Sequence, residues 1–262
     1  MLAPGWTQLA ALLAAAAIAA LATPAGISGA VLLLPFQVSV LGTPSPAVTP
    51  TNLLYNVVAT PGGLYRYWRQ GQRGGRLAIV LVAGTVPGVI GGSVIRALLL
   101  PGARVFDLVV AAVLIPVGSW LTVSRPAASA RARATEIRDS VLVFLAMAVG
   151  CIGGIYGIGG GSIIAPVLIG AGRPPSEVAP AALASTFVTS LAGVVTFTIL
   201  ATQQHGSVAP DWTTGVALGL GGLAGAYAGA RLQPRLPEAA LRRLIGVLVI
   251  AIGARYLWAG LG

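Results

Sequence analysis

Long apolar runs alternate with short polar segments along the whole chain. The runs 6–41 and 140–172 contain no charged residue. As a single helix the first run would be about 54 Å long, whereas the apolar core of a bilayer is about 30 Å thick. We therefore expect each run to form a broken or re-entrant helical hairpin that returns to its starting side. Thr23-Pro24, followed by Gly26, offers the break in the first run.

Three ordinary membrane spans are expected after each hairpin. They lie near 50–65, 77–95 and 105–123, and near 180–203, 212–230 and 239–259. No positively charged segment precedes the first apolar run, which argues against a cleaved signal peptide. The pattern predicts an all-α polytopic membrane protein.

The chain contains an internal repeat. The stretch "GISG" at 26–29 aligns with "GIGG" at 157–160, and the later matches follow in the same order. The matched pairs are Pro35 and Pro166, Pro50 and Pro180, Gly63 and Gly193, and the glycine rows Gly84, Gly88, Gly92 and Gly221, Gly225, Gly229. We predict a first transmembrane repeat at 1–123, a polar cytoplasmic linker at 124–139 and a second repeat at 140–262.

The charges favour an inverted arrangement of these repeats. All basic residues are arginines, and with returning hairpins thirteen fall on one side of the membrane against three on the other. Because cytoplasmic loops carry the excess of positive charge, we expect the loops 66–76, 125–138 and 231–243 to be cytoplasmic. The formal charge of +10 is then an orientation signal in short loops, not a surface for nucleic acid.

The two glycine-rich breaks are the predicted substrate site. In carriers with inverted repeats, helices interrupted at matching positions of both halves form the site, and half-helix N-termini suit anions. The candidate residues are Gly26, Ser28 and Gly29 in the first half and Gly157, Gly159, Gly160 and Gly161 in the second. The simpler reading is that glycines let helices pack closely, and we prefer it for the two glycine rows.

Neutral polar residues follow the loops in both halves. Asn52 and Asn56 lie four residues apart, as do Ser185 and Thr189, so each pair shares a helix face. With Thr186, these side chains could hold an anion without burying a fixed charge. The alternative is N-capping and hydrogen bonding between helices.

Other chemistry finds little support in the sequence. The six acidic residues lie in loops or at span ends, which disfavours a buried proton relay or a metal-cation carrier. With one cysteine and one histidine, we expect no metal site, no cofactor and no catalytic residue. The stretch "GIGGGS" lacks the strand and acidic residue of a dinucleotide loop.

Three alternatives stay open. Ser28 in "GISG", with His205 as base, could form an intramembrane serine hydrolase. A passive anion channel would have similar composition. The third is a membrane subunit that depends on a separate soluble ATPase. The ATPase would have to be separate because this sequence has no P-loop of its own.

The stretch "GIYGIGGGSIIAPVLIGAGRPPSEVAPAALASTFVTSLAGVVTF" (154–197) resembles the sulfite exporter TauE/SafE family, also called TSUP permeases. The first half departs from this pattern, since Ser28 and Ala30 replace glycines. The resemblance implies a secondary permease for a small, often sulfur-containing anion such as sulfite or an organosulfonate. We expect alternating access at a midplane site in a bacterial inner (plasma) membrane. The expected partners are the anionic substrate and the lipid bilayer, and a homo-oligomer stays open.

Overall fold

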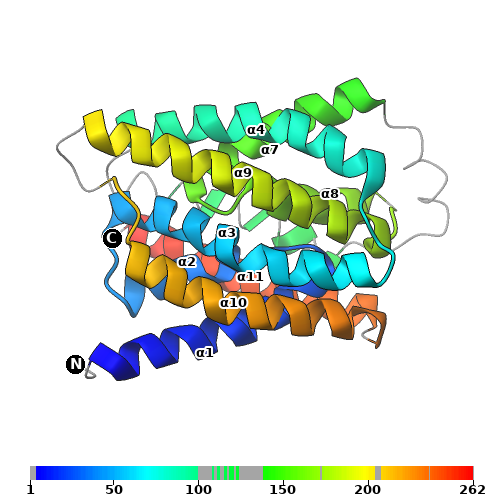
Figure 1. Ribbon diagram of the computed structural model, residues 1–262, viewed down its shortest axis with the longest axis horizontal. Coiled ribbons are helices and arrows are strands. Elements are labelled where there is room, and N and C mark those ends of the chain that lie inside the picture. The colour runs from blue at the N-terminus through cyan, green and yellow to red at the C-terminus, as the bar shows by residue number, and fades with distance from the viewer. Residues whose placement is uncertain are drawn as a thin grey trace.

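The computed structural model describes residues 4–99, 138–171, 173–203, 208–235 and 237–261, with scattered positions between 108 and 123. Within these residues every regular element is a helix (Figure 1). The helices are α1 (Pro4–Ala22), α2 (Ala30–Ser39), α3 (Ser45–Arg69), α4 (Gly75–Leu98), α7 (Asp139–Tyr156), α8 (Gly160–Gly170), α9 (Pro175–Gln203), α10 (Trp212–Leu232) and α11 (Glu238–Leu261), with 3-10 turns η1 (Thr23–Ala25) and η2 (Gln233–Arg235). The predicted span near 105–123 lies largely outside the described residues.

The helices have the length and the surface that a membrane requires. Four stretches among the described residues are long and apolar enough to cross it: Gln8–Ala25, Gly75–Leu98, Asp139–Tyr156 and Pro175–Gln203. Large apolar side chains on these helices point outward, with Ile79 71% and Phe144 67% exposed. Large exposed apolar surfaces mark contact with a membrane or with another protein. The predicted all-α membrane class is confirmed.

Two predicted helix boundaries are wrong. Pro50 and Pro180 were expected to end loops, but each is the sixth residue of a helix, α3 or α9. Near a helix start the missing N–H of proline removes only one backbone hydrogen bond, so the helix can begin earlier. As a result the polar residues that follow lie well inside helices rather than at their starts.

Each hairpin has one long limb and one limb of half length. At 1.5 Å per residue, α1 and α7 are about 28 and 27 Å long, whereas α2 and α8 are about 15 and 16 Å. The chain does turn back: Gly29 packs against Ile18 and Ala19 of α1, and Gly153 of α7 packs against Gly159. The chain therefore folds back at both breaks, and each second limb is roughly half as long as the first.

The two glycine rows bring helices from different halves of the chain into close contact. A Cβ added at Gly84, Gly88 or Gly92 of α4 would collide with the α7 carbonyl oxygens of Val143, Met147 and Cys151. In the same way, Gly221, Gly225 and Gly229 of α10 face the α1 carbonyl oxygens of Leu12, Ala16 and Ala20. Close packing, the reading preferred from the sequence, is confirmed for both rows.

The long helices form two groups with α3 and α9 between them. Figure 1 shows α4 and α7 along one side of the molecule and α1 and α10 along the opposite side. The helix α3 packs mainly on α10, α9 packs mainly on α4, and α3 and α9 also touch each other. These two central helices are antiparallel, since Leu53 contacts Gly193 whereas Gly63 contacts Leu183.

Arginines from several loops gather at one end of the molecule. Arg76 forms an ion pair with Asp139 at the start of α7, and Gln70 donates a hydrogen bond to the carbonyl oxygen of Ala230, next to Arg231. Exposed Tyr65 and Trp68 lie at the same end. Below, this is called the arginine-rich end, and it comprises the described arginines of 66–76, 173 and 231–235.

Candidate functional site

The N-termini of the two half-length helices meet in the interior. The backbone N–H of Ser28, just before α2, donates a hydrogen bond to Ser162 Oγ in the first turn of α8, at 3.1 Å. Each helix N-terminus carries a partial positive charge from its aligned peptide dipoles. Two such ends converging on one point create a region that favours a negative charge.

This junction lies near the middle of the two central helices, α3 and α9. Asn56 in α3 and Thr186 in α9 are both eleven residues beyond the start of their helices, which corresponds to about 16 Å along each axis. Because the two helices are antiparallel, these distances are measured from opposite ends of the molecule. Both side chains thus lie near the middle of their helices, which have 25 and 29 residues.

On the first-half side of the junction, Ser28 lies two residues before the start of α2. Its hydroxyl accepts a hydrogen bond from the backbone N–H of Ala30 at 3.1 Å and donates one to Asn56 Oδ1. The other side of the amide, Asn56 Nδ2, is fully buried and has no hydrogen-bond partner. Asn56 Nδ2 is therefore an unpaired donor on this side of the junction.

On the second-half side, two hydroxyls face the glycine turn before α8. Thr186 Oγ1 and Ser190 Oγ are fully buried without hydrogen-bond partners. A Cβ added at Gly159 would lie 3.1 Å from Ser190 Oγ, and one at Gly161 would lie 2.5 Å from Thr186 Oγ1. No side chain caps α8. Glycine here keeps the helix N-terminus open to the two hydroxyls.

The remaining glycines of the breaks serve the backbone. Gly26 and Gly157 each have a φ of +73°, which a residue with a Cβ rarely adopts. Gly26 lies against Ala179 at the start of α9, and Gly157 lies against the carbonyl oxygen of Thr49 at the start of α3. Each break thus docks on the central helix of the other half. Gly29 and Gly160 are closely covered by the side chains of Tyr55 and Thr85.

Two of the predicted site residues are already hydrogen-bonded. Asn52 Nδ2 donates to the carbonyl oxygen of Ala30 at 2.9 Å, and Asn52 Oδ1 accepts from Gln37 Nε2 at 2.8 Å. Ser185 Oγ lies 2.8 Å from Thr85 Oγ1 of α4. The structure brings Ser28, Asn56, Thr186, Gly159 and Gly161 together, whereas Asn52 and Ser185 brace neighbouring helices.

Sequence reasoning missed several polar residues here. Ser190 follows Thr186 by four residues, a helical spacing that could have indicated its position. Ser162 and Gln37 are polar positions within apolar runs, the pattern that marks buried function in membranes. The expectation that the arginines lie in loops is wrong for Arg96. It is only 2% exposed in the last turn of α4, where its Nε donates to Thr49 Oγ1 at 3.3 Å.

The site holds neither a nucleophile with a base nor a metal cage among the described residues. The hydroxyl of Ser28 is engaged by Asn56 and by the start of α2. His205, the base of the hydrolase alternative, lies outside the described residues. No group of three His, Cys, Asp or Glu side chains that could bind a metal ion occurs in the part of the chain that the structure describes.

What the site offers is binding without a fixed charge. Amide and hydroxyl donors and two helix N-termini surround the point where two interrupted helices meet. Paired interrupted helices of this kind are typical of polytopic helical membrane transporters.

Comparison with known proteins identifies the family. The model of the sulfite exporter TauE/SafE family matches residues 11–256, and the chain belongs to this family. A "Probable membrane transporter protein" from Xylella fastidiosa (strain 9a5c) is 27% identical over 248 residues, covering 89% of this chain and 88% of that protein. "Probable membrane transporter protein YunE" from Bacillus subtilis (strain 168) is 29% identical over 123 residues, 47% of this chain and 42% of that protein. No solved structure matches. The protein is a membrane transporter rather than an enzyme.

Proposed function

We propose that this transporter is a secondary carrier of a small anion, which binds at the junction of the α2 and α8 N-termini. The observation that carries this proposal is the set of three fully buried polar atoms without partners there: Asn56 Nδ2, Thr186 Oγ1 and Ser190 Oγ. Leaving a buried donor unpaired costs about 1–3 kcal/mol. A bound anion would accept these hydrogen bonds and remove that cost.

The substrate class follows from the donors and from the family. Neutral donors and helix dipoles can hold an anion and still release it, since no salt bridge has to be broken. The family's description supports a sulfur oxyanion such as sulfite, or an organosulfonate. Gly26, Gly29, Gly157 and Gly160 would shape the site, while Ser28, Asn56, Gly159, Gly161, Thr186 and Ser190 would line it.

The repeats would be inverted, and the moving units would each contain helices from both. Each break docks on the central helix of the other half, and each glycine row packs on the first helix of the other half. One unit would comprise α1, α2, α3 and α10, and the other α7, α8, α9 and α4. The substrate junction lies between these units, as alternating access requires.

The arginine-rich end would face the cytoplasm of a bacterial cell. The positive-inside rule supports this orientation, as do Tyr65 and Trp68, which are exposed at that end where interfacial aromatic residues are expected. The loops 66–76, 125–138 and 231–243 would then be cytoplasmic.

Counterflow in proteoliposomes tests the proposal. Purified protein would be reconstituted, preloaded with unlabelled sulfite or an alkanesulfonate, and supplied with trace labelled anion outside. Thr186→Val removes the unpartnered hydroxyl with little change in shape, and we expect it to raise the KM about tenfold. Thr198→Val is the matched control, because the Thr198 hydroxyl bonds only within its own helix, to the Val194 carbonyl oxygen.

Saturable counterflow that Thr186→Val weakens and Thr198→Val leaves intact would establish the carrier and its site. Conductance without counterflow would instead identify a passive channel. Equal effects of the two variants would refute the proposed position of the site.

A further inference from the structure

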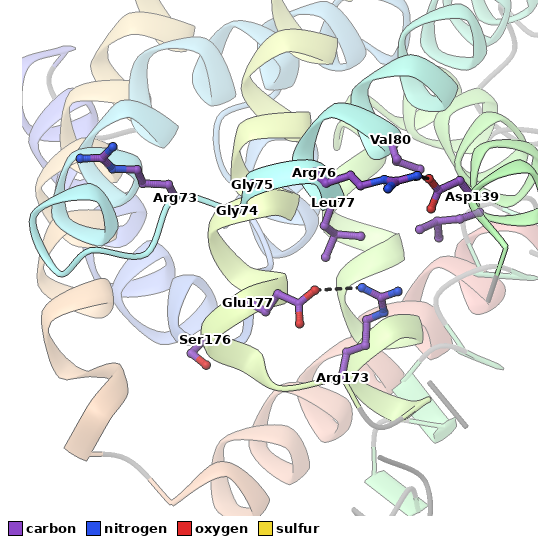
Figure 2. A pocket seen from close by; sticks show the side chains of 11 residues that line it. Arg73, Gly74, Gly75, Arg76, Leu77, Val80, Asp139, Arg173, Ser176 and Glu177 are labelled. Atoms are coloured by element: carbon purple, nitrogen blue, oxygen red, sulfur yellow. Dashed lines mark hydrogen bonds and ion pairs between the residues drawn. The ribbon is translucent and has the colours of Figure 1, made fainter. Parts of the chain in front are cut away.

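A second polar region lies at the arginine-rich end, away from the substrate junction. It is a cavity of about 470 Å³ (Figure 2), lined by residues from both halves. Its walls are Arg73, Gly74, Gly75, Arg76, Leu77 and Val80 from the α3–α4 connection and α4, Asp139 and Leu142 from α7, and Arg173, Ser176 and Glu177 around the start of α9. We propose that this cavity is a vestibule with its own anion-binding site, centred on Arg173. The inference rests on the proposed function, because the vestibule would deliver the anion to the junction.

Arg173 is the side chain best placed to bind. It is 18% exposed, its NH1 bonds Glu177 Oε1 at 2.8 Å, and its Nε is buried without a partner. Figure 2 shows the Arg173 and Glu177 side chains directed toward each other inside the cavity. A guanidinium presents several N–H donors in one plane and binds oxyanions through two of them.

The carboxylates in the cavity set how strongly an anion can compete. Three arginines and two acidic residues line it, so its formal charge is positive by one. Arg76 and Asp139 form an ion pair whose side chains are 84% and 46% exposed, and such pairs contribute little to stability. Glu177 competes directly for the Arg173 guanidinium. An arriving anion thus meets donors that are held by weak partners.

The floor of the cavity leads toward the junction. Leu77 and Leu142 close it, and both are buried. Eight residues farther along α4, about 12 Å from Leu77, Thr85 contacts Gly160 at the α8 N-terminus. About two helical turns of apolar packing therefore separate the vestibule from the substrate junction. This layer would keep the pathway closed on this side in the conformation seen here.

The shape of the vestibule indicates which anions fit best. Its lining combines the Arg173 guanidinium with the apolar side chains of Leu77, Val80 and Leu142. An oxyanion head with a short alkyl body would use both surfaces, whereas an inorganic oxyanion would use only the first. The expected ligands are short-chain sulfonates or carboxylates.

Equilibrium binding to the purified full-length protein tests the site directly. Calorimetric titration with propanesulfonate and with sulfate would be done at constant ionic strength, on a Thr186→Val background that weakens the substrate junction. We expect propanesulfonate to bind more tightly than sulfate, and Arg173→Gln to weaken its binding about tenfold. Glu177→Gln should have the opposite sign and tighten binding, since it frees the guanidinium. Arg235→Gln, an exposed arginine outside the cavity, is the control.

The pair of opposite effects separates a binding role from a structural one. The vestibule site would be overturned if Arg173→Gln and Glu177→Gln both weakened binding, or if neither variant changed it. Transport adds a second readout: Arg173→Gln should raise the KM from the arginine-rich side only. Sulfonate binding that depends on Arg173 in a protein without counterflow would contradict the proposed carrier but not the anion site. Counterflow with an unchanged KM in Arg173→Gln would contradict the vestibule alone.

Discussion

Two asparagines one helical turn apart have different environments. Both polar atoms of the Asn52 amide have partners: Oδ1 accepts from Gln37, and Nδ2 donates to the carbonyl oxygen of Ala30. This side chain therefore connects α3 to α2. Asn56 shares one oxygen with Ser28 and keeps an unpaired donor at the junction. At the residue scale, the number of satisfied hydrogen bonds separates Asn52, which connects two helices, from Asn56, the proposed substrate ligand.

Asn52→Leu should therefore lower stability more than it alters substrate affinity. It removes the acceptor of the Gln37 Nε2 donor and the hydrogen bond to the Ala30 carbonyl oxygen, and an unpaired buried donor costs about 1–3 kcal/mol. Thermal unfolding in detergent would show a lower midpoint, while the KM for counterflow in the folded fraction stays near that of the wild type. A large rise in KM with unchanged stability would instead place Asn52 in the substrate site.

At the scale of elements, the helix surfaces decide which neighbours can approach. Gly88 of α4 lies against Met147 and Cys151 of α7, whereas Gly91, three residues later, has nothing within 4 Å of an added Cβ. Glycine thus has two different structural roles on the same helix. At Gly88 it permits contact between backbones, and at Gly91 it only lowers helix propensity.

The pair Gly88→Ala and Gly91→Ala measures this contrast. The first should destabilise the protein by about 1–3 kcal/mol, because the new methyl group collides with the Met147 carbonyl. The second should be neutral or stabilising by up to about 1 kcal/mol, since alanine favours the helix. Thermal unfolding of both variants checks this, and equal losses would mean that α4 and α7 do not meet as described.

The apolar pattern sufficed to predict the helices, the returning hairpins and the paired breaks, because these follow from bilayer thickness and from glycine and proline. It did not predict that helices α3 and α9 begin before Pro50 and Pro180, since a proline near a helix start costs little. Nor did it predict the burial of Arg96 or the satisfied state of Asn52. Both depend on which helices become neighbours, and local sequence does not encode that.

At the scale of the whole molecule, the proposed units cut across the sequence halves, and distances can tell the two descriptions apart. Four exposed positions serve as spin-label sites: Leu13 and Ile79 in the first half, and Phe144 and Leu220 in the second. Labels would be introduced in a Cys151→Ser background, and distances measured by double electron–electron resonance with and without substrate.

If the proposed units move, substrate changes the distances 13–79 and 144–220 but not 13–220 and 79–144. Rocking of one sequence half against the other would give the reverse pattern, since each half would then be the rigid body. No change in any of the four distances would contradict alternating access by either pair of units.

Each glycine row packs on a helix of the other half, and this affects the order in which the protein can fold during synthesis. The glycines of α4 pack on the backbone of α7. When α4 leaves the ribosome, α7 has not yet been synthesised, since it begins only at Asp139. The partner of α1 is synthesised even later, because α10 begins at Trp212. Neither half can complete its interior alone during biosynthesis, so the membrane must hold a partly assembled first half until the second half arrives. Insertion of the first helices and completion of the packing are thus separate events for this protein.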